Sequence, residues 1–76
     1  MKDVLEYVAR RLVDDPDAVR VTAVEGKRSV ILQLQVAPED MGKVIGRGGR
    51  IARAIRSVVR AAGTLDGVTA MVEIVG

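Results

Sequence analysis

A seven-residue segment, Ile45-Gly46-Arg47-Gly48-Gly49-Arg50-Ile51, combines a flexible backbone with positive charge, and this combination suits phosphate binding. Glycine at both ends of a four-residue turn, Gly46 and Gly49, lets a ligand approach the backbone because no side chain stands in the way. The segment opens into a predicted helix, whose first N–H groups are free and carry the positive end of the helix dipole. We therefore expect this segment to be a phosphate-binding loop.

The basic residues of the chain gather around this loop. Residues 1–41 carry six basic and eight acidic side chains, whereas residues 42–76 carry six basic and two acidic ones. No acid lies within residues 42–61, and the basic residues there are Lys43, Arg47, Arg50, Arg53, Arg56 and Arg60. A local basic stretch is typical of nucleic-acid binders, so we expect the phosphate to belong to a single-stranded nucleic acid.

Catalytic and metal-binding chemistry is not indicated by the composition. The chain has no histidine and no cysteine, which leaves no zinc site, no thiol nucleophile and no Ser-His pair. Its acids are scattered or lie near the ends of predicted helices. We expect no enzymatic activity, no metal and no cofactor. An enzyme that handles a nucleotide with carboxylates and arginines alone is the alternative.

Two common phosphate-binding motifs are excluded by the residues that follow the glycines. A Walker loop needs Lys and then Ser or Thr after its last glycine, but Arg50 and Ile51 occupy those positions. A dinucleotide fingerprint needs a third glycine at the position of Ile51 and a strand before the loop, where a short helix is predicted instead. An ordinary turn between two helices is the remaining alternative for this loop.

The helix after the loop is predicted over about residues 49–62, and it has two contrasting faces. One face collects the apolar side chains that we expect in the core, namely Ile51, Ile55, Val58 and Ala62. The opposite face collects Arg53, Arg56 and Arg60, with Arg50 to one side near the loop. This arginine face is either a binding surface or a solvated one, and no acid on the helix is available to pair with it.

The N-terminal half predicts a helix followed by a hairpin. Apolar residues at helical spacing predict an amphipathic helix over residues 2–13, which ends before Pro16. Alternating β-branched residues predict strands over 19–24 and 29–36, and the short turn between them implies an antiparallel pair. The single aromatic residue, Tyr7, is predicted to be a partly buried packing residue.

The C-terminal half predicts two helices around the loop and a last strand. Pro38 begins a short helix, in which Gly42 is interpreted as a helix break or a close packing contact. The helix after the loop is predicted to end at Gly63, acting as a left-handed cap. A turn at Asp66-Gly67 then leads into a strand over residues 68–75.

The order of elements and the loop together resemble the KH family. The predicted order, α-β-β-α-α-β, defines an α+β fold of one domain over residues 1–76, with a three-stranded sheet packed on one face by three helices. A G-x-x-G loop that joins two helices is the signature of KH domains, here in their type II order. Residues 42–56 around the loop are similar to the small bacterial single-KH RNA-binding proteins of the KhpA family. In one departure from the commonest pattern, Ala52 occupies the apolar position three residues after the second loop glycine.

The resemblance implies a binding mode for about four nucleotides of single-stranded RNA. The loop N–H groups and Arg47 would meet the sugar-phosphate backbone, while Lys43, Arg50 and Arg53 would add positive charge. Bases would lie over an aliphatic groove, because the chain lacks the aromatic residues of a stacking platform. The predicted RNA-binding residues are Lys43, Val44, Ile45, Gly46, Arg47, Gly48, Gly49, Arg50 and Arg53, of which Val44 and Ile45 would wall the groove.

The resemblance also implies a role and partners. The role is that of an RNA chaperone or post-transcriptional regulator, and the partners are a second copy of the chain or a larger KH-containing RNA-binding protein. The alternative is a protein–protein dimerisation module of the KH fold, in which RNA contact is secondary. The choice between RNA and single-stranded DNA is left open, because it depends on contacts to a 2′-hydroxyl.

The sequence also predicts where the protein resides. No apolar run approaches the roughly 20 residues of a membrane span. The N-terminal residues lack the apolar core of a signal peptide. We therefore expect a cytoplasmic protein with no membrane contact.

Overall fold

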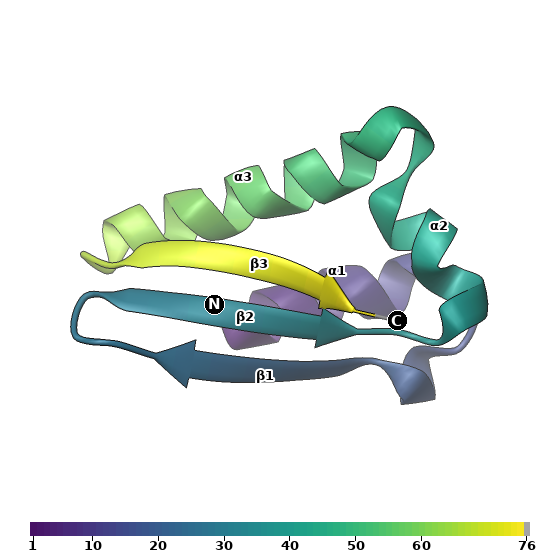
Figure 1. The fold of residues 1–76 in the computed structure, drawn as a ribbon, viewed down its shortest axis with the longest axis horizontal. Coiled ribbons are helices and arrows are strands. Elements are labelled where there is room, and N and C mark those ends of the chain that lie inside the picture. The colour runs from purple at the N-terminus through teal and green to yellow at the C-terminus, as the bar shows by residue number, and fades with distance from the viewer. Residues whose placement is uncertain (76) are drawn as a thin grey trace.

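A helix and a β-hairpin form the first half of the fold in the computed structural model, which describes residues 1–75 (Figure 1). Helix α1 spans Lys2–Leu12 and is followed by a short 3₁₀ turn at Pro16–Ala18. Strands β1 (Arg20–Glu25) and β2 (Ser29–Gln35) are antiparallel neighbours. The predicted helix and hairpin are confirmed, with each boundary within one residue.

The second half of the fold returns to the sheet through two helices. After a 3₁₀ turn at Pro38–Asp40, helix α2 spans Met41–Ile45 and helix α3 spans Arg50–Leu65. Strand β3 (Thr69–Val75) follows. It pairs in parallel with β2, so the sheet order is β1-β2-β3.

Helix α3 ends later than predicted, and a different glycine terminates it. The left-handed residue is Gly67, with φ +74°. The N–H of Val68 donates to the carbonyl of Gly63 (2.8 Å), and the N–H of Gly67 donates to the carbonyl of Thr64 (3.1 Å). These two bonds define a Schellman cap centred on Gly67. The prediction that Gly63 is the cap is therefore wrong.

Gly63 lies inside α3 where the helix crosses β3 at close range. A Cβ atom at this position would lie 2.8 Å from the Cβ of Ala70 and 2.9 Å from the carbonyl oxygen of Val68. No real Cβ packs at such distances, so Gly63 allows the helix and the strand to approach each other. This close packing explains why position 63 is a glycine.

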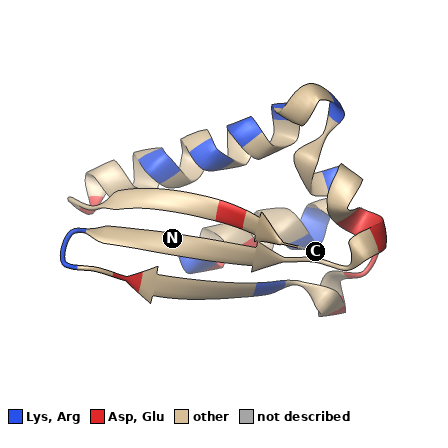
Figure 2. Cartoon of the chain, in the orientation of Figure 1, with Lys and Arg blue, Asp and Glu red and all other residues tan. Residues whose placement is uncertain are grey.

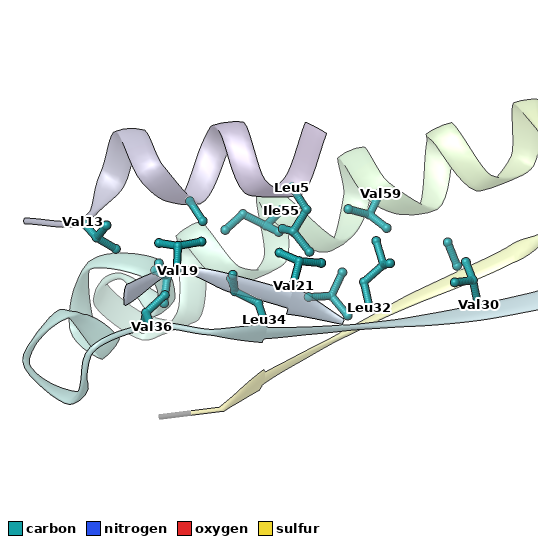
Figure 3. Close-up of a cluster of buried hydrophobic side chains, with 14 residues drawn as sticks. Leu5, Val13, Val19, Val21, Val30, Leu32, Leu34, Val36, Ile55 and Val59 are labelled. Carbon is teal, nitrogen blue, oxygen red and sulfur yellow. The ribbon is translucent and has the colours of Figure 1, made fainter. Parts of the chain in front are cut away.

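One face of the sheet is covered by helices, and the core lies between the two layers (Figure 3). Helix α1 packs against β1 and helix α3 against β3, while α2 lies at one end of the sheet and packs against α3 (Figure 1). The core side chains are apolar and come from every layer: Leu5, Ala9, Val13, Val19, Val21, Val30, Leu32, Leu34, Val36, Val44, Ile55, Val59, Ala70 and Val72. The α+β prediction is confirmed.

The buried face of α3 differs from the predicted one. Its buried residues are Ala52, Ile55, Val59 and Gly63, whereas Val58 is 53% exposed. The apolar residues of α3 lie on more than one face of the helix. The close contact of Gly63 with β3 determines which of these faces packs against the sheet. Ala52, which departs from the commonest KH pattern, lies on this buried face.

Tyr7 lies on the surface rather than in the core. Its side chain is 61% exposed, and its ring faces the guanidinium of Arg11 at 5.1 Å from the ring centroid. The hydroxyl of Tyr7 accepts a hydrogen bond of 2.9 Å from Arg11 Nη2. The prediction of a packing role is therefore wrong, because one turn of α1 places Tyr7 beside Arg11 on the solvent side.

Candidate nucleic-acid interface

The predicted loop reverses the chain between α2 and α3 in four residues. Three of them have a positive φ: Gly46 (+75°), Gly48 (+64°) and Gly49 (+78°). Residues with a side chain rarely adopt such values, and the left-handed conformation costs them about 1–2 kcal/mol each. The reversal therefore depends on the glycines that the sequence provides.

The loop glycines have two different functions. A Cβ at Gly46 would lie 2.7 Å from Cγ1 of Ile51, so this glycine lets the end of α2 pack on the first turn of α3. A Cβ at Gly48 would meet no atom within 4 Å, and one at Gly49 would meet only an arginine tip. Gly46 thus closes the corner, while Gly48 and Gly49 leave an open approach to the backbone.

The N-terminus of α3 is open at the same place. Its N-cap residue is Gly49, and no side chain bonds to the first N–H groups of the helix. The N–H of Arg50, the first residue of the helix, donates to the carbonyl of Arg47 in the preceding 3₁₀ turn, and the dipole of this 16-residue helix makes its N-terminal end positive. An anion that reaches the loop therefore meets a positive helix end that no side chain caps.

Two of the predicted arginines lie at the loop, and one lies elsewhere. Arg47 is an exposed residue of the loop itself. Arg53 turns back toward it, and its Nη1 donates to the carbonyl of Gly48 at 3.1 Å. Arg50, by contrast, lines an apolar hollow of about 290 Å³ between α1 and α3. The structure therefore groups Arg47 and Arg53 with the loop glycines and leaves Arg50 at the rim of a different surface.

Lys43 is held by two carboxylates. Its Nζ lies 3.0 Å from Oδ2 of Asp14 and 3.4 Å from Oδ1 of Asp40. The bond and charge of Asp14 raise the pKa of Lys43, with a smaller contribution from Asp40 against partial burial. Because its charge is balanced locally, Lys43 adds less attraction for phosphate than its position in the sequence predicts.

Asp40 is a buried acid that joins α2 to the connection after α1. It is only 2% exposed, and Oδ2 accepts a hydrogen bond of 3.1 Å from the N–H of Asp15. Burial would raise the pKa of this carboxyl, but the N–H groups of Asp15 and Asp14 and the ammonium of Lys43 together hold it below its ordinary value. This anchored carboxylate fixes the start of the short helix that leads into the loop.

The two predicted groove walls have different surroundings. Val44 is fully buried in the core, so it offers no surface to a base, and we assign it to packing instead. Ile45 is 37% exposed at the end of α2, directly before Gly46. Of these two residues, Ile45 is therefore the one that presents an apolar surface beside the loop.

A hollow lies between α3 and β3, and the sequence pattern does not predict it. Arg56, Arg60 and residues 70–72 line a space of about 190 Å³. Nε of Arg56 donates to the carbonyl of Val72 at 3.4 Å. The spacing of Arg53, Arg56 and Arg60 predicts their common face, but only the fold places the edge strand beside them. Figure 2 shows the basic residues of α3 as blue bands along the helix.

Residues 1–75 contain neither a cluster of metal-ligating side chains nor a helix that could span a membrane. Within residues 1–75, no group of three or more His, Cys, Asp or Glu side chains is placed to hold a metal ion. No helix in this range has both the length and the apolar character needed to cross a membrane.

A type II KH domain is the class that this order of elements and this glycine loop define. Residues 2–74 match the family described as "KhpA/KhpB, KH domain", so the chain belongs to that family.

Curated relatives are similar to this chain over nearly its whole length and theirs. The chain is 56% identical to "RNA-binding protein KhpA" of Clostridium acetobutylicum, in an alignment that covers 99% of this chain and 100% of the relative. It is 53% identical, with the same coverage, to the protein of that name from Clostridium perfringens, and 47% identical to the one from Aquifex aeolicus, over 97% of this chain and 94% of the relative. No solved structure matches the chain.

Proposed function

We propose that this protein binds single-stranded RNA through the loop formed by residues 46–49. The observation that carries the proposal is the loop itself, in which open glycine backbone faces the uncapped N-terminus of α3. The curated relatives bear the name RNA-binding protein, which supports RNA as the ligand. Binding, rather than catalysis, is the activity that this surface supports.

The proposed binding mode uses backbone donors, one apolar wall and exposed arginine charge. The positive N-terminal end of α3, which no side chain caps, and the exposed Arg47 side chain meet phosphate oxygens. Arg53 uses one of its guanidinium N–H groups in the hydrogen bond to the carbonyl of Gly48. Its other N–H groups are free to bind the same phosphates. Ile45 supplies aliphatic contact for a base. With so few contacts, we expect weak binding that falls steeply as salt is added.

Weak binding by one domain fits a role that needs rapid exchange. We propose that the protein acts as an RNA chaperone or post-transcriptional regulator. A second KH domain, on another copy or on a larger KH-containing RNA-binding protein, would raise the affinity through effective concentration without any new contact.

A titration of short single-stranded RNA at low and moderate salt tests the loop. The main variant is Arg47→Asp with Gly48→Asp, which places two acids where phosphate would lie. Asp tolerates a left-handed conformation better than most residues, and the position of Gly48 has open space, so the variant is expected to fold. Circular dichroism checks the fold.

The matched control separates local from overall charge. Arg47→Asp alone and Lys2→Asp on α1 change the net charge by the same amount. We expect Arg47→Asp to weaken binding strongly and Lys2→Asp to change it little. Equal weakening by the two single variants would refute the loop as the site, and equal binding by the wild type and the folded double variant would do so too.

A second proposal, a dimer of this chain, is favoured by the apolar hollow between α1 and α3. Its lining is apolar apart from Arg50, and it includes Leu5, Val8, Ile51 and Val58. Around it, side chains that normally avoid water are exposed, including Val58 at 53%. A second copy that covered this face would bury them. This dimer is compatible with RNA binding at the loop.

Light scattering after size exclusion, over a range of protein concentrations, tests the dimer. Val58→Glu places a charge in the hollow, and Val24→Glu places the same charge on the uncovered face of the sheet, where Val24 is 51% exposed. We expect Val58→Glu to be a monomer and Val24→Glu to dimerise like the wild type. A wild type that stays monomeric at every concentration would refute the proposal.

A further inference from the structure

An exposed carboxylate holds the lysine that precedes the glycine loop. Nζ of Lys43 lies 3.0 Å from Oδ2 of Asp14, which belongs to the connection between α1 and the 3₁₀ turn at Pro16–Ala18. Figure 2 shows red segments where this connection meets the start of α2. The side chain of Asp14 is 82% exposed and that of Lys43 is 43% exposed. Ion pairs with this much exposure are weak, so a competing anion can replace the carboxylate.

Lys43 lies within reach of an anion at the loop. It is in the last turn of α2, three residues before Gly46, whose N–H still donates to the carbonyl of Gly42 at 2.9 Å. Residues three apart on a helix are surface neighbours, about 5–6 Å from each other. Because the lysine side chain is a flexible four-carbon stem, its ammonium can leave Asp14 and turn toward a phosphate beside Gly46.

The second carboxylate beside Lys43 has a different function. Oδ1 of Asp40 lies 3.4 Å from Nζ, farther than the 3.0 Å to Asp14. The other oxygen of Asp40 accepts a hydrogen bond from the N–H of Asp15, and this buried side chain anchors the start of α2. Asp14 has no such anchoring role for its carboxylate, so it is the partner that an incoming phosphate displaces.

We infer that Asp14 competes with RNA for Lys43: its carboxylate pairs with the ammonium in the free protein, and an RNA phosphate at the loop must displace it. This inference rests on the proposed function, because the phosphate in question is the one bound at the loop. Asp14 therefore lowers the affinity of the protein for RNA. It determines how much of the positive charge of α2 is available to the ligand.

Asp14→Asn tests the competition, because it removes the negative charge and keeps the size of the side chain at an exposed position. Asp15→Asn is the matched control. Asp15 is the next residue, is also exposed, and its side chain forms no ion pair within residues 1–75. Both variants change the net charge equally. At low salt we expect Asp14→Asn to bind short single-stranded RNA up to about fivefold more tightly than Asp15→Asn, and added salt to reduce this difference.

A double-mutant cycle connects the gain to Lys43. In a Lys43→Gln background we expect Asp14→Asn and Asp15→Asn to bind RNA equally, because the ammonium for which Asp14 competes is absent. Asp14→Glu provides a second check that leaves Lys43 unchanged: it keeps the carboxylate, so we expect it to bind like the wild type. Circular dichroism and thermal midpoints verify that each variant is folded.

The outcomes separate this inference from the proposed function. If Asp14→Asn binds RNA no more tightly than Asp15→Asn while the loop variant, Arg47→Asp with Gly48→Asp, loses binding, the competition is refuted and the loop site stands. A gain that persists in the Lys43→Gln background would be an effect of overall charge and would also refute the competition. If the loop variant binds RNA like the wild type, the proposed function fails, whatever Asp14→Asn does.

Discussion

Replacing Gly46 by Ala tests whether the loop is built as the structure indicates. Gly46 has φ +75° and ψ 172°, a combination that is essentially restricted to glycine. Its added Cβ would also lie 2.7 Å from Cγ1 and 3.0 Å from Cβ of Ile51. The second of these atoms is fixed by the backbone of α3, so a rotamer change cannot relieve the whole clash.

The expected cost follows from these two effects. A residue held in such a conformation costs about 1–3 kcal/mol, and overpacking costs typically about 1–3 kcal/mol more. We expect Gly46→Ala to lower the free energy of unfolding by about 3 kcal/mol or more. Gly48→Ala is the matched control, because φ is +64° there but the space is open; we expect it to cost only about 1 kcal/mol.

Urea denaturation followed by circular dichroism measures both variants. A domain of this size has a total stability of about 4–11 kcal/mol, so the difference between the variants is large enough to resolve. A double-mutant cycle with Ile51→Ala isolates the steric part, because that change removes Cγ1 and Cδ1 from the clash. We expect Gly46→Ala to cost less in the Ile51→Ala background, with a coupling of roughly 1 kcal/mol.

Two results would refute this reasoning. Equal costs for Gly46→Ala and Gly48→Ala would show that the corner between α2 and α3 is not closed by the missing Cβ. A cycle without coupling would assign the whole effect to backbone conformation and none to Ile51.

Three further changes have expected outcomes. Gly42→Ala should raise the free energy of unfolding by about 0.5–1 kcal/mol in urea denaturation, because Gly42 lies inside α2 and its added Cβ meets no atom within 4 Å; destabilisation would contradict this. Gly63→Ala should lower it by about 1–3 kcal/mol, since its Cβ meets Ala70, and an unchanged stability would count against close packing of helix and strand. The lowered pKa of Asp40 stabilises the fold above the ordinary carboxyl pKa, and this contribution is lost as pH falls through that value toward the lower pKa of the folded state. Asp40→Asn should therefore flatten the acid side of the stability profile, measured as thermal midpoint against pH, and an unchanged profile would refute the linkage.

Gly42 and Gly63 show where sequence interpretation of glycine fails. The local pattern predicts that Gly42 is a helix break or a close packing contact and that Gly63 is a helix cap. In the structure, Gly42 continues a helix in open space, while Gly63 is the close contact and Gly67 the cap. A glycine has the same local signature in each case, so only the neighbouring element shows which property of the residue is used.

The helices, the strands, their order and the glycine loop follow from local features of the sequence. Helical spacing, alternation and turn residues act between neighbours along the chain, so the helices, the hairpin and residues 46–49 could be recognised without a structure. The match of the loop and the element order to the KH family followed from those local features.

Which side chains are available at the site depends on how the helices pack against the sheet. Val44 is in the core, Lys43 is paired with two carboxylates and Arg50 turns toward α1, whereas Arg56 and Arg60 lie beside β3. These outcomes depend on contacts between residues far apart in the chain, such as Lys43 with Asp14, and on the rotation of α3 that Gly63 sets against β3. The local sequence pattern does not indicate these contacts or this rotation, because both arise only when the helices pack on the sheet.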